Sequence, residues 1–153
     1  MLALLVSACQ PALNWRELRP AGFGVAAAFP CKPDVEQRQA SGLAQCEAGD
    51  RGFALSWAEA PEATQAGAAL KAMTQALATK LGAPLPAAVP LQVPGMTPLT
   101  EAAQYRMAGP RGVTRVAVFA YGARVYQALM TAPSDDAAAW ATFVAGLRVE
   151  TAR

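Results

Sequence analysis

The sequence predicts an α+β domain in which an antiparallel sheet of about six strands packs against two helices. Several short segments alternate apolar and polar residues, which is typical of half-buried strands. Two longer segments, 61–81 and 134–148, instead place apolar residues three or four positions apart, which is typical of helices. Each helical segment follows a group of strand-like segments. The predicted order is therefore β-β-β-α-β-β-β-α, and this grouping favours hairpin-linked strands covered by helices.

The first group of strands is expected at 23–29, 35–39 and 53–59. In the first of these, every second residue is apolar: Phe23, Val25, Ala27 and Phe29. Pro30 then ends the strand, because proline cannot donate to a sheet. The segment 14–20 also alternates and is either a short first strand or an ordered lead-in. Ser41-Gly42 and the stretch 47–52 are interpreted as turns.

The first helix is expected to run from Pro61 to Leu81. Proline suits the first helical position, Glu62 suits the positive end of the helix dipole, and Gly82 is a favourable stop. Four residues form one predicted apolar stripe: Leu70, Met73, Leu77 and Leu81. Five prolines between residues 84 and 98 then exclude a helix or a central strand. This stretch is either a crossover to the second group of strands or a docking surface for a partner.

The second group is a three-stranded meander expected at 100–107, 113–121 and 124–131. Residues 108–112 form its first turn, and Gly122-Ala123 favours a tight hairpin. Ser134 is the expected N-cap of the closing helix, with Asp135 and Asp136 complementing its dipole. Four residues form the stripe expected to face the core: Trp140, Phe143, Val144 and Leu147.

The N-terminal stretch LLVSAC, residues 4–9, resembles the end of a bacterial lipoprotein signal. An apolar residue and two small ones precede Cys9. The resemblance implies that the Cys9 thiol receives a diacylglycerol, that the chain is cut before Cys9, and that the new amino group is acylated. This divides the chain into a truncated signal at 1–8, a tether and lead-in at 9–20, and one domain at 21–149. No basic residue precedes Cys9, so either the true start lies upstream or the segment is a short strand with a free cysteine. Gln10, rather than aspartate, favours the outer membrane.

Cys31 and Cys46 flank a predicted hairpin. If the chain is exported, it enters an oxidising compartment in which paired cysteines form disulfides. A structural disulfide between these two residues is therefore expected. Two buried free thiols, a redox pair and a metal site remain as alternatives, although the sequence has no CxxC motif and no histidine.

The absence of histidine removes Ser-His-Asp and Cys-His triads, imidazole bases and histidine-bound zinc. Asp135 and Asp136 are adjacent, and neighbouring helical side chains diverge, so a helix-capping role is favoured over a catalytic pair. No enzyme activity, metal or cofactor is expected. A net charge of +2 without a basic run argues against nucleic-acid binding. Arg106, Arg115 and Arg124 form a possible basic patch for a lipid or a partner if they share a face of the sheet; otherwise they belong to a solvated outer face.

The segment GFGVAAAFPCKP, residues 22–33, resembles the entry strand of small exported bacterial domains. The segments ARVYQALMTAP and AAWATFVAGLRV, which begin at Ala123 and Ala138, resemble their last hairpin strand and closing helix. On these residues the chain is similar to an uncharacterised exported lipoprotein family with a PsbP-like α/β sandwich. The resemblance implies accessory binding to larger envelope assemblies and supplies no catalytic residues.

The expected function is therefore that of a lipid-anchored envelope protein, facing the periplasm and acting through contacts with a protein partner. The alternative is a module that binds a small ligand or lipid in a cleft between sheet and helix. An apolar cavity of about 300 Å³ or more would favour this alternative, whereas a closed, well-packed core would favour the contact function.

Overall fold

The computed structural model describes residues 13–150 and confirms the α+β class. Its main sheet has seven antiparallel strands in the order β3-β4-β5-β9-β8-β7-β6. These strands are β3 (Asp34–Arg38), β4 (Ser41–Ala48), β5 (Arg51–Glu59), β6 (Val89–Pro90), β7 (Ala103–Gly109), β8 (Gly112–Tyr121) and β9 (Arg124–Ala132). A smaller sheet has the order β1-β2-β10, with β1 (Arg16–Leu18), β2 (Val25–Phe29) and β10 (Arg148–Val149).

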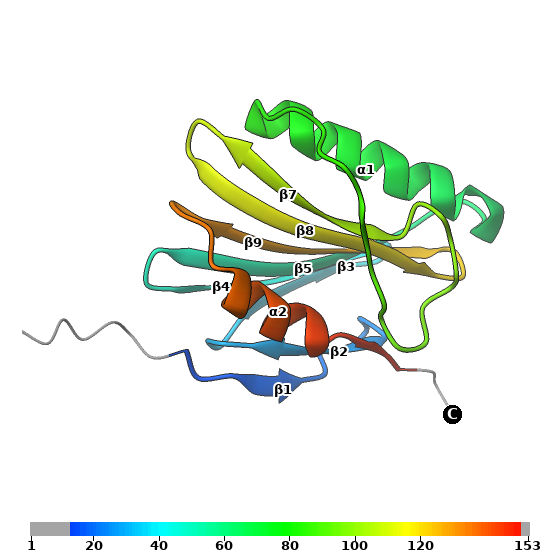
Figure 1. Ribbon diagram of the computed structural model, residues 1–153. Helices are drawn as coiled ribbons and strands as arrows, with labels where there is room; N and C mark the ends of the chain where they lie inside the picture. Colours follow the sequence, from blue (N-terminus) through cyan, green and yellow to red (C-terminus); the bar gives the residue numbers. More distant parts are fainter. Residues whose placement is uncertain (1–12, 151–153) are drawn as a thin grey trace, which may run out of the picture.

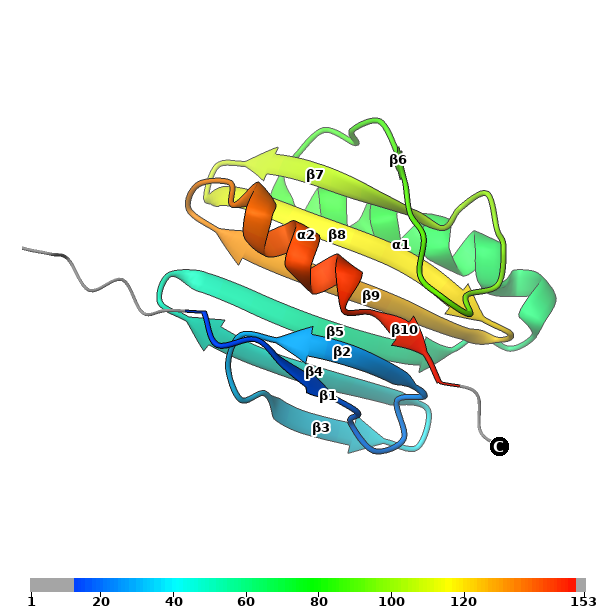
Figure 2. The same ribbon diagram turned by 60° about the horizontal axis from the view of Figure 1, so that its bottom comes forward.

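The large sheet lies between two covering layers (Figures 1 and 2). Helix α1 (Ala66–Leu81) crosses one face above β7, β8 and β9. Helix α2 (Ala137–Ala145) and the small sheet cover the opposite face. Each interface has its own apolar core. Leu70 of α1 lies in one buried cluster with Val116 and Val118 of β8. Phe143 of α2 packs between Phe29 of β2 and Phe53 of β5.

The predicted meander is confirmed, since β7, β8 and β9 pair in sequence order through tight turns. Of the first expected group, strand β2 lies in the small sheet. Strands β3 and β5 of that group join the meander in one sheet, because β5 pairs with β9 along nearly its whole length, from Gly52↔Thr131 to Glu59↔Arg124. This central pairing brings residues of the first group next to residues more than sixty positions away. It places Trp57 beside Tyr126 in register.

Residues 13–150 contain ten strands in two sheets, so the expectation of about six strands and of the order β-β-β-α-β-β-β-α is wrong in detail. The longest strand that was missed is β4. Ser41-Gly42, expected to be a turn, lies inside this strand, and the turn falls at Gln39-Ala40. Gly42 has a packing role instead, because a Cβ there would lie 2.2 Å from Nε1 of Trp57 on the paired strand.

The proline-rich stretch runs from α1 to β7 and contributes only the two-residue edge strand β6. This agrees with the exclusion of a helix or central strand there. Two of its apolar residues, Leu91 and Val93, are buried in the core beneath α2. The stretch is therefore part of the packed domain as well as a connection.

Helix α1 begins later than expected, because residues 63–65 form a 3₁₀ turn and the α-helix starts at Ala66. The expected stop is confirmed: Gly82 has φ of 63°, a left-handed conformation that glycine adopts without strain. The buried side follows Ala66, Leu70, Thr74 and Ala78, whereas Met73, Leu77 and Leu81 are only half-buried. Small side chains on the buried row allow the helix to lie close to the sheet.

Helix α2 begins at Ala137, and its N-cap is Asp136 rather than Ser134. A carboxylate oxygen of Asp136 accepts a hydrogen bond from the backbone N–H of Ala139 at 3.0 Å. The expected stripe is largely confirmed, since Trp140, Phe143 and Leu147 are buried and Val144 is half-buried. The ring of Phe143 lies near four other aromatic rings, those of Trp15, Phe29, Phe53 and Trp140.

Candidate functional site

Cys31 and Cys46 form a disulfide, with a Cα–Cα distance of 6.0 Å. Cys31 follows β2 of the small sheet and Cys46 lies on β4, so the bridge links the small sheet to the large one. Beside it, the backbone N–H of Asn14 donates to the carbonyl of Pro30 at 3.2 Å. The N-terminal end of the described chain is thus fixed directly next to the disulfide. Cys9 lies outside the described residues, and its acylation stays a prediction.

The three arginines of the predicted patch share one face of the sheet, but the structure brings only two of them together. Arg106 on β7 and Arg115 on β8 are direct partners in register. Arg115 pairs on its other side with Met130 of β9. Arg124 lies six residues away from Met130, and at about 3.3 Å per residue this is on the order of 20 Å. The predicted basic patch is therefore divided into the pair Arg106 and Arg115 and the separate Arg124.

Both members of the pair bind Asp135. Arg115 donates to its two carboxylate oxygens at 2.9 and 2.6 Å, and Arg106 donates at 3.2 Å. The hydrogen bond from Arg115, with a further one from Arg106, lowers the pKa of Asp135 below its ordinary value. Two guanidinium groups thus share one carboxylate, and the cluster keeps a net positive charge.

Asp136 has a different set of partners. The backbone N–H of Ala139 and the guanidinium of Arg51 both donate to its carboxylate, and both lower its pKa. The adjacent pair Asp135-Asp136 is therefore engaged in capping α2 and in ion pairing. This arrangement joins α2 to β5, β7 and β8.

Arg124 is the centre of a structural cluster at the other end of the sheet. It donates to Glu59 at 2.8 Å and to the carbonyl of Gly22 at 2.7 Å, and its guanidinium lies over the ring of Trp57. Nearby, the hydroxyl of Tyr126 donates to the carbonyl of Phe23 at 2.7 Å. Burial raises the pKa of this hydroxyl. These contacts hold the loop before β2 against the large sheet.

A surface hollow of about 640 Å³ lies where the C-terminal end of α1 meets the turns of the sheet. The last turn of α1, the β7–β8 turn and the end of β9 form its walls, and the charged side chains of Asp50, Lys80 and Arg111 line it. The hollow is open to solvent at the rim of the sheet, so it differs from the apolar cavity between sheet and helix that the ligand-binding alternative calls for. The sequence contains no signal for its position, because segments that are distant in sequence form it: the β4–β5 turn, the end of α1, the β7–β8 turn and the end of β9.

A second hollow, of about 340 Å³, lies beside the disulfide. Asn14, Arg16 and Leu18 form one side, and residues 29–32 form the other. Its two charged residues, Arg16 and Lys32, are exposed. Neither forms an ion pair within the part of the chain that the structure describes.

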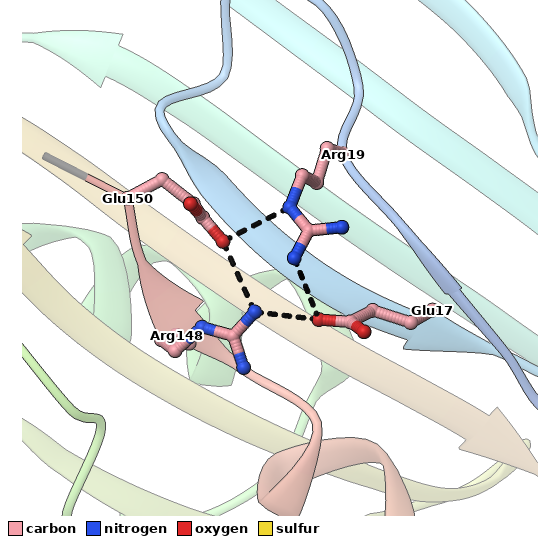
Figure 3. Close-up of polar contacts among 4 residues, drawn as sticks. All are labelled: Glu17, Arg19, Arg148 and Glu150. Atoms are coloured by element: carbon pink, nitrogen blue, oxygen red, sulfur yellow. Dashed lines mark hydrogen bonds and ion pairs between the residues drawn. The ribbon is translucent and has the colours of Figure 1, made fainter. Parts of the chain in front are cut away.

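Four charged residues close the small sheet on its outer side (Figure 3). Arg148 donates to Glu17 at 2.6 Å and to Glu150 at 3.1 Å, and Arg19 donates to Glu150 at 3.1 Å. Arg148 and then Arg19 lower the pKa of Glu150. The ring has two positive and two negative charges, and its residues are exposed except for the half-buried Glu150. It is therefore a balanced surface network that joins the β1 and β10 segments.

Among residues 13–150, no three histidine, cysteine or acidic side chains are grouped as a metal site. No helix in the same range is long and apolar enough to cross a membrane. Searches of protein-family models, of curated proteins and of solved structures found no match to this chain. The resemblance to PsbP-like domains remains a prediction.

Proposed function

We propose that this chain is a non-enzymatic accessory domain of the bacterial cell envelope, held at a membrane by lipid on Cys9. The observation that carries the proposal is the disulfide between Cys31 and Cys46. Structural disulfides persist in oxidising compartments such as the periplasm and are rare in the cytosol. An exported chain with an apolar and small-residue segment directly before Cys9 fits a lipoprotein signal better than a buried strand.

The proposed action is through contacts with a partner protein rather than through chemistry. Asp135 and Asp136 are the adjacent carboxylates that the sequence offers as a catalytic pair. They form ion pairs with three arginines, and Asp136 also caps α2. Arg124 and Glu59 are likewise engaged with each other. These groups support the fold, which favours a binding role.

The test is to express the chain in its native host and to analyse the purified protein by mass spectrometry. The expected N-terminal peptide begins at Cys9 and carries a diacylglycerol, and non-reducing digestion yields Cys31 and Cys46 in one linked pair of peptides. Cys9→Ser should abolish acylation and leave the link intact. Intact, unacylated protein in the cytosolic fraction with two free thiols would overturn the proposal. If the acylated protein is found, affinity purification from native membranes would identify the partner.

The hollow of about 640 Å³ at the end of α1 favours a second candidate function, binding of a small ligand. Its volume lies within the range of about 300–1,000 Å³ that is typical of small-molecule sites, although the hollow is open to solvent. Native mass spectrometry of gently purified protein should show a bound mass, and Thr131→Trp, which places an indole in the hollow, should remove it. A ligand-free spectrum for the unmodified protein would count against this function.

A further inference from the structure

We propose that the end of the domain that carries Arg16 and Lys32 lies against the bilayer and binds the phosphate groups of anionic lipids. This inference rests on the proposed attachment through Cys9 and adds an orientation and a lipid-binding surface to it. The two cations line the hollow of about 340 Å³ beside the disulfide. The polar side chain of Asn14 also lines this hollow.

The cations are available for a ligand. Both residues are exposed, and neither has an acidic partner within residues 13–150. Asp34, the nearest acid to Lys32 along the chain, forms no ion pair with it. By contrast, the other arginines of the small sheet, Arg19 and Arg148, are used in the ring with Glu17 and Glu150 (Figure 3).

The surface is rigidly connected to the point where the N-terminal segment enters the domain. Arg16 pairs with Phe29 in the β1–β2 register, and Phe29 is fully buried. Asn14 is bonded to Pro30, and the next residue, Cys31, is covalently linked to β4. The hollow therefore cannot rotate independently of Leu13, the first described residue.

The length of the tether determines which end of the domain meets the membrane. Four residue steps separate Cys9 from Leu13, and an extended chain covers at most about 14 Å over four steps. A folded domain of this size has a radius of gyration of about 14 Å and is therefore more than twice as wide as the tether is long. The entry end is thus confined close to the lipid headgroups. The described chain leaves the domain at the opposite end (Figures 1 and 2).

Charge complementarity identifies the occupant. A basic residue close to an anionic membrane surface strengthens binding about fivefold, and the effect decays within a Debye length of about 8 Å at physiological salt. Two such residues together strengthen binding to the membrane roughly thirtyfold. The tether confines Arg16 and Lys32 close to the surface, whereas Arg38 and Lys71 lie elsewhere, next to the β3–β4 turn and on α1.

The first experiment is lysine footprinting of the acylated protein in vesicles that contain 30% phosphatidylglycerol. Lys32 and Lys71 are both exposed, and their rates of acetylation are compared within the same molecule. The expected result is that Lys32 is acetylated at least about fivefold more slowly than in detergent, while Lys71 is unchanged. The same change for both lysines between detergent and vesicles, or no change for Lys32, would overturn the inference. Acylation of Cys9 is measured in the same sample, so failure of the orientation is distinguished from failure of the anchor.

The second experiment uses Cys9→Ser protein, which has no anchor, and measures sedimentation with the same vesicles. Arg16→Glu/Lys32→Glu should reduce binding at least tenfold. The matched control is Arg38→Glu/Lys71→Glu, which changes the net charge equally and should retain most of the binding. Equal losses in both double variants, or no preference for anionic over neutral vesicles, would overturn the inference. Circular dichroism of each variant confirms that the fold is kept.

Discussion

The guanidinium carbon of Arg124 lies 3.8 Å from the centre of the Trp57 ring. The indole is buried between this cation and Gly42 of the neighbouring strand, and its Nε1 has no hydrogen-bond partner in the described structure. Trp57 also makes an edge contact with Phe23, the residue whose carbonyl accepts the Tyr126 hydroxyl. One tryptophan therefore joins β4, β9 and the loop before β2.

We expect Gly42→Ala to lower the free energy of unfolding by about 1–3 kcal/mol, the usual result of overpacking a core. The added Cβ would lie 2.2 Å from Nε1 of Trp57, which is held on its other face by Arg124. Gly67→Ala is the matched control, because its Cβ meets only the movable end of Glu101 and alanine favours the helix. Urea unfolding measures both, and equal stability of the two variants would contradict the packing role of Gly42.

We expect Arg124→Lys to cost about 1–2 kcal/mol of stability, although the charge is kept. An ammonium group cannot reproduce the planar set of donors that reaches Glu59 and the Gly22 carbonyl while stacking on Trp57. Arg106→Lys should change stability by less than about 0.5 kcal/mol, because Arg115 still binds Asp135. Similar losses in the two variants, measured by urea unfolding, would show that Arg124 has no special role.

We expect Cys31→Ser/Cys46→Ser to lower stability by about 3 kcal/mol in the chain-entropy account of a cross-link over a separation of 15 residues. The small sheet would then be joined to β4 only by packing and by the chain itself. Cys9→Ser leaves the bridge intact and serves as the control in thermal and urea unfolding. A double variant as stable as the control would mean that the bridge adds nothing to the fold.

We expect Phe143→Ala to lower stability by about 3–5 kcal/mol, because it removes a fully buried ring that contacts four others. Val144→Ala, on the half-buried side of the same helix, should cost less than half as much. Differential scanning calorimetry gives both values. A small loss for Phe143→Ala would contradict the position of α2 over β2 and β5.

Stability should fall on acidification as Asp135 and Asp136 become protonated. The pKa values of both are lowered in the folded state, so the folded chain binds fewer protons than the unfolded chain between the two pKa values. Their contribution is present above the unfolded pKa of about 3.9 and is lost as pH falls through the lower folded pKa. Asp135→Asn and Asp136→Asn should each flatten the curve of stability against pH below about pH 5. Curves parallel to that of the unmodified chain would contradict these roles.

The sequence predicted best the elements that pattern and composition determine locally. Alternation located β2, β5, β7 and β8, the Gly122-Ala123 hairpin located β9, and Gly82 located the end of α1. Strand β4 was missed because it contains Ser41, Gly42 and Gln45, which are poor strand residues in isolation. Its conformation follows from pairing with β3 and β5 and from the space that Trp57 occupies. Tertiary contacts override local propensity here.

The candidate sites divide in the same way. The disulfide could be predicted because it needs only two cysteines and an oxidising compartment. The partners of the arginines could not, since Asp135 reaches Arg106 and Arg115 only after the turn that follows β9. Both Ser134 and Asp136 are good capping residues, and Arg51, eighty-five positions from Asp136, helps to fix the latter at the cap. The ion-pair partners and the N-cap of α2 depend on contacts between residues far apart in sequence, which a local sequence pattern does not show.

The ring of Glu17, Arg19, Arg148 and Glu150 has a consequence for the order in which the domain assembles (Figure 3). Strand β2 lies between β1 and β10, and Arg148 and Glu17 are 131 positions apart. The small sheet cannot close until residues near position 150 have been synthesised. During that interval the edge of β2 that later pairs with β10 is unpaired, and an unpaired strand edge is open to pairing with another chain.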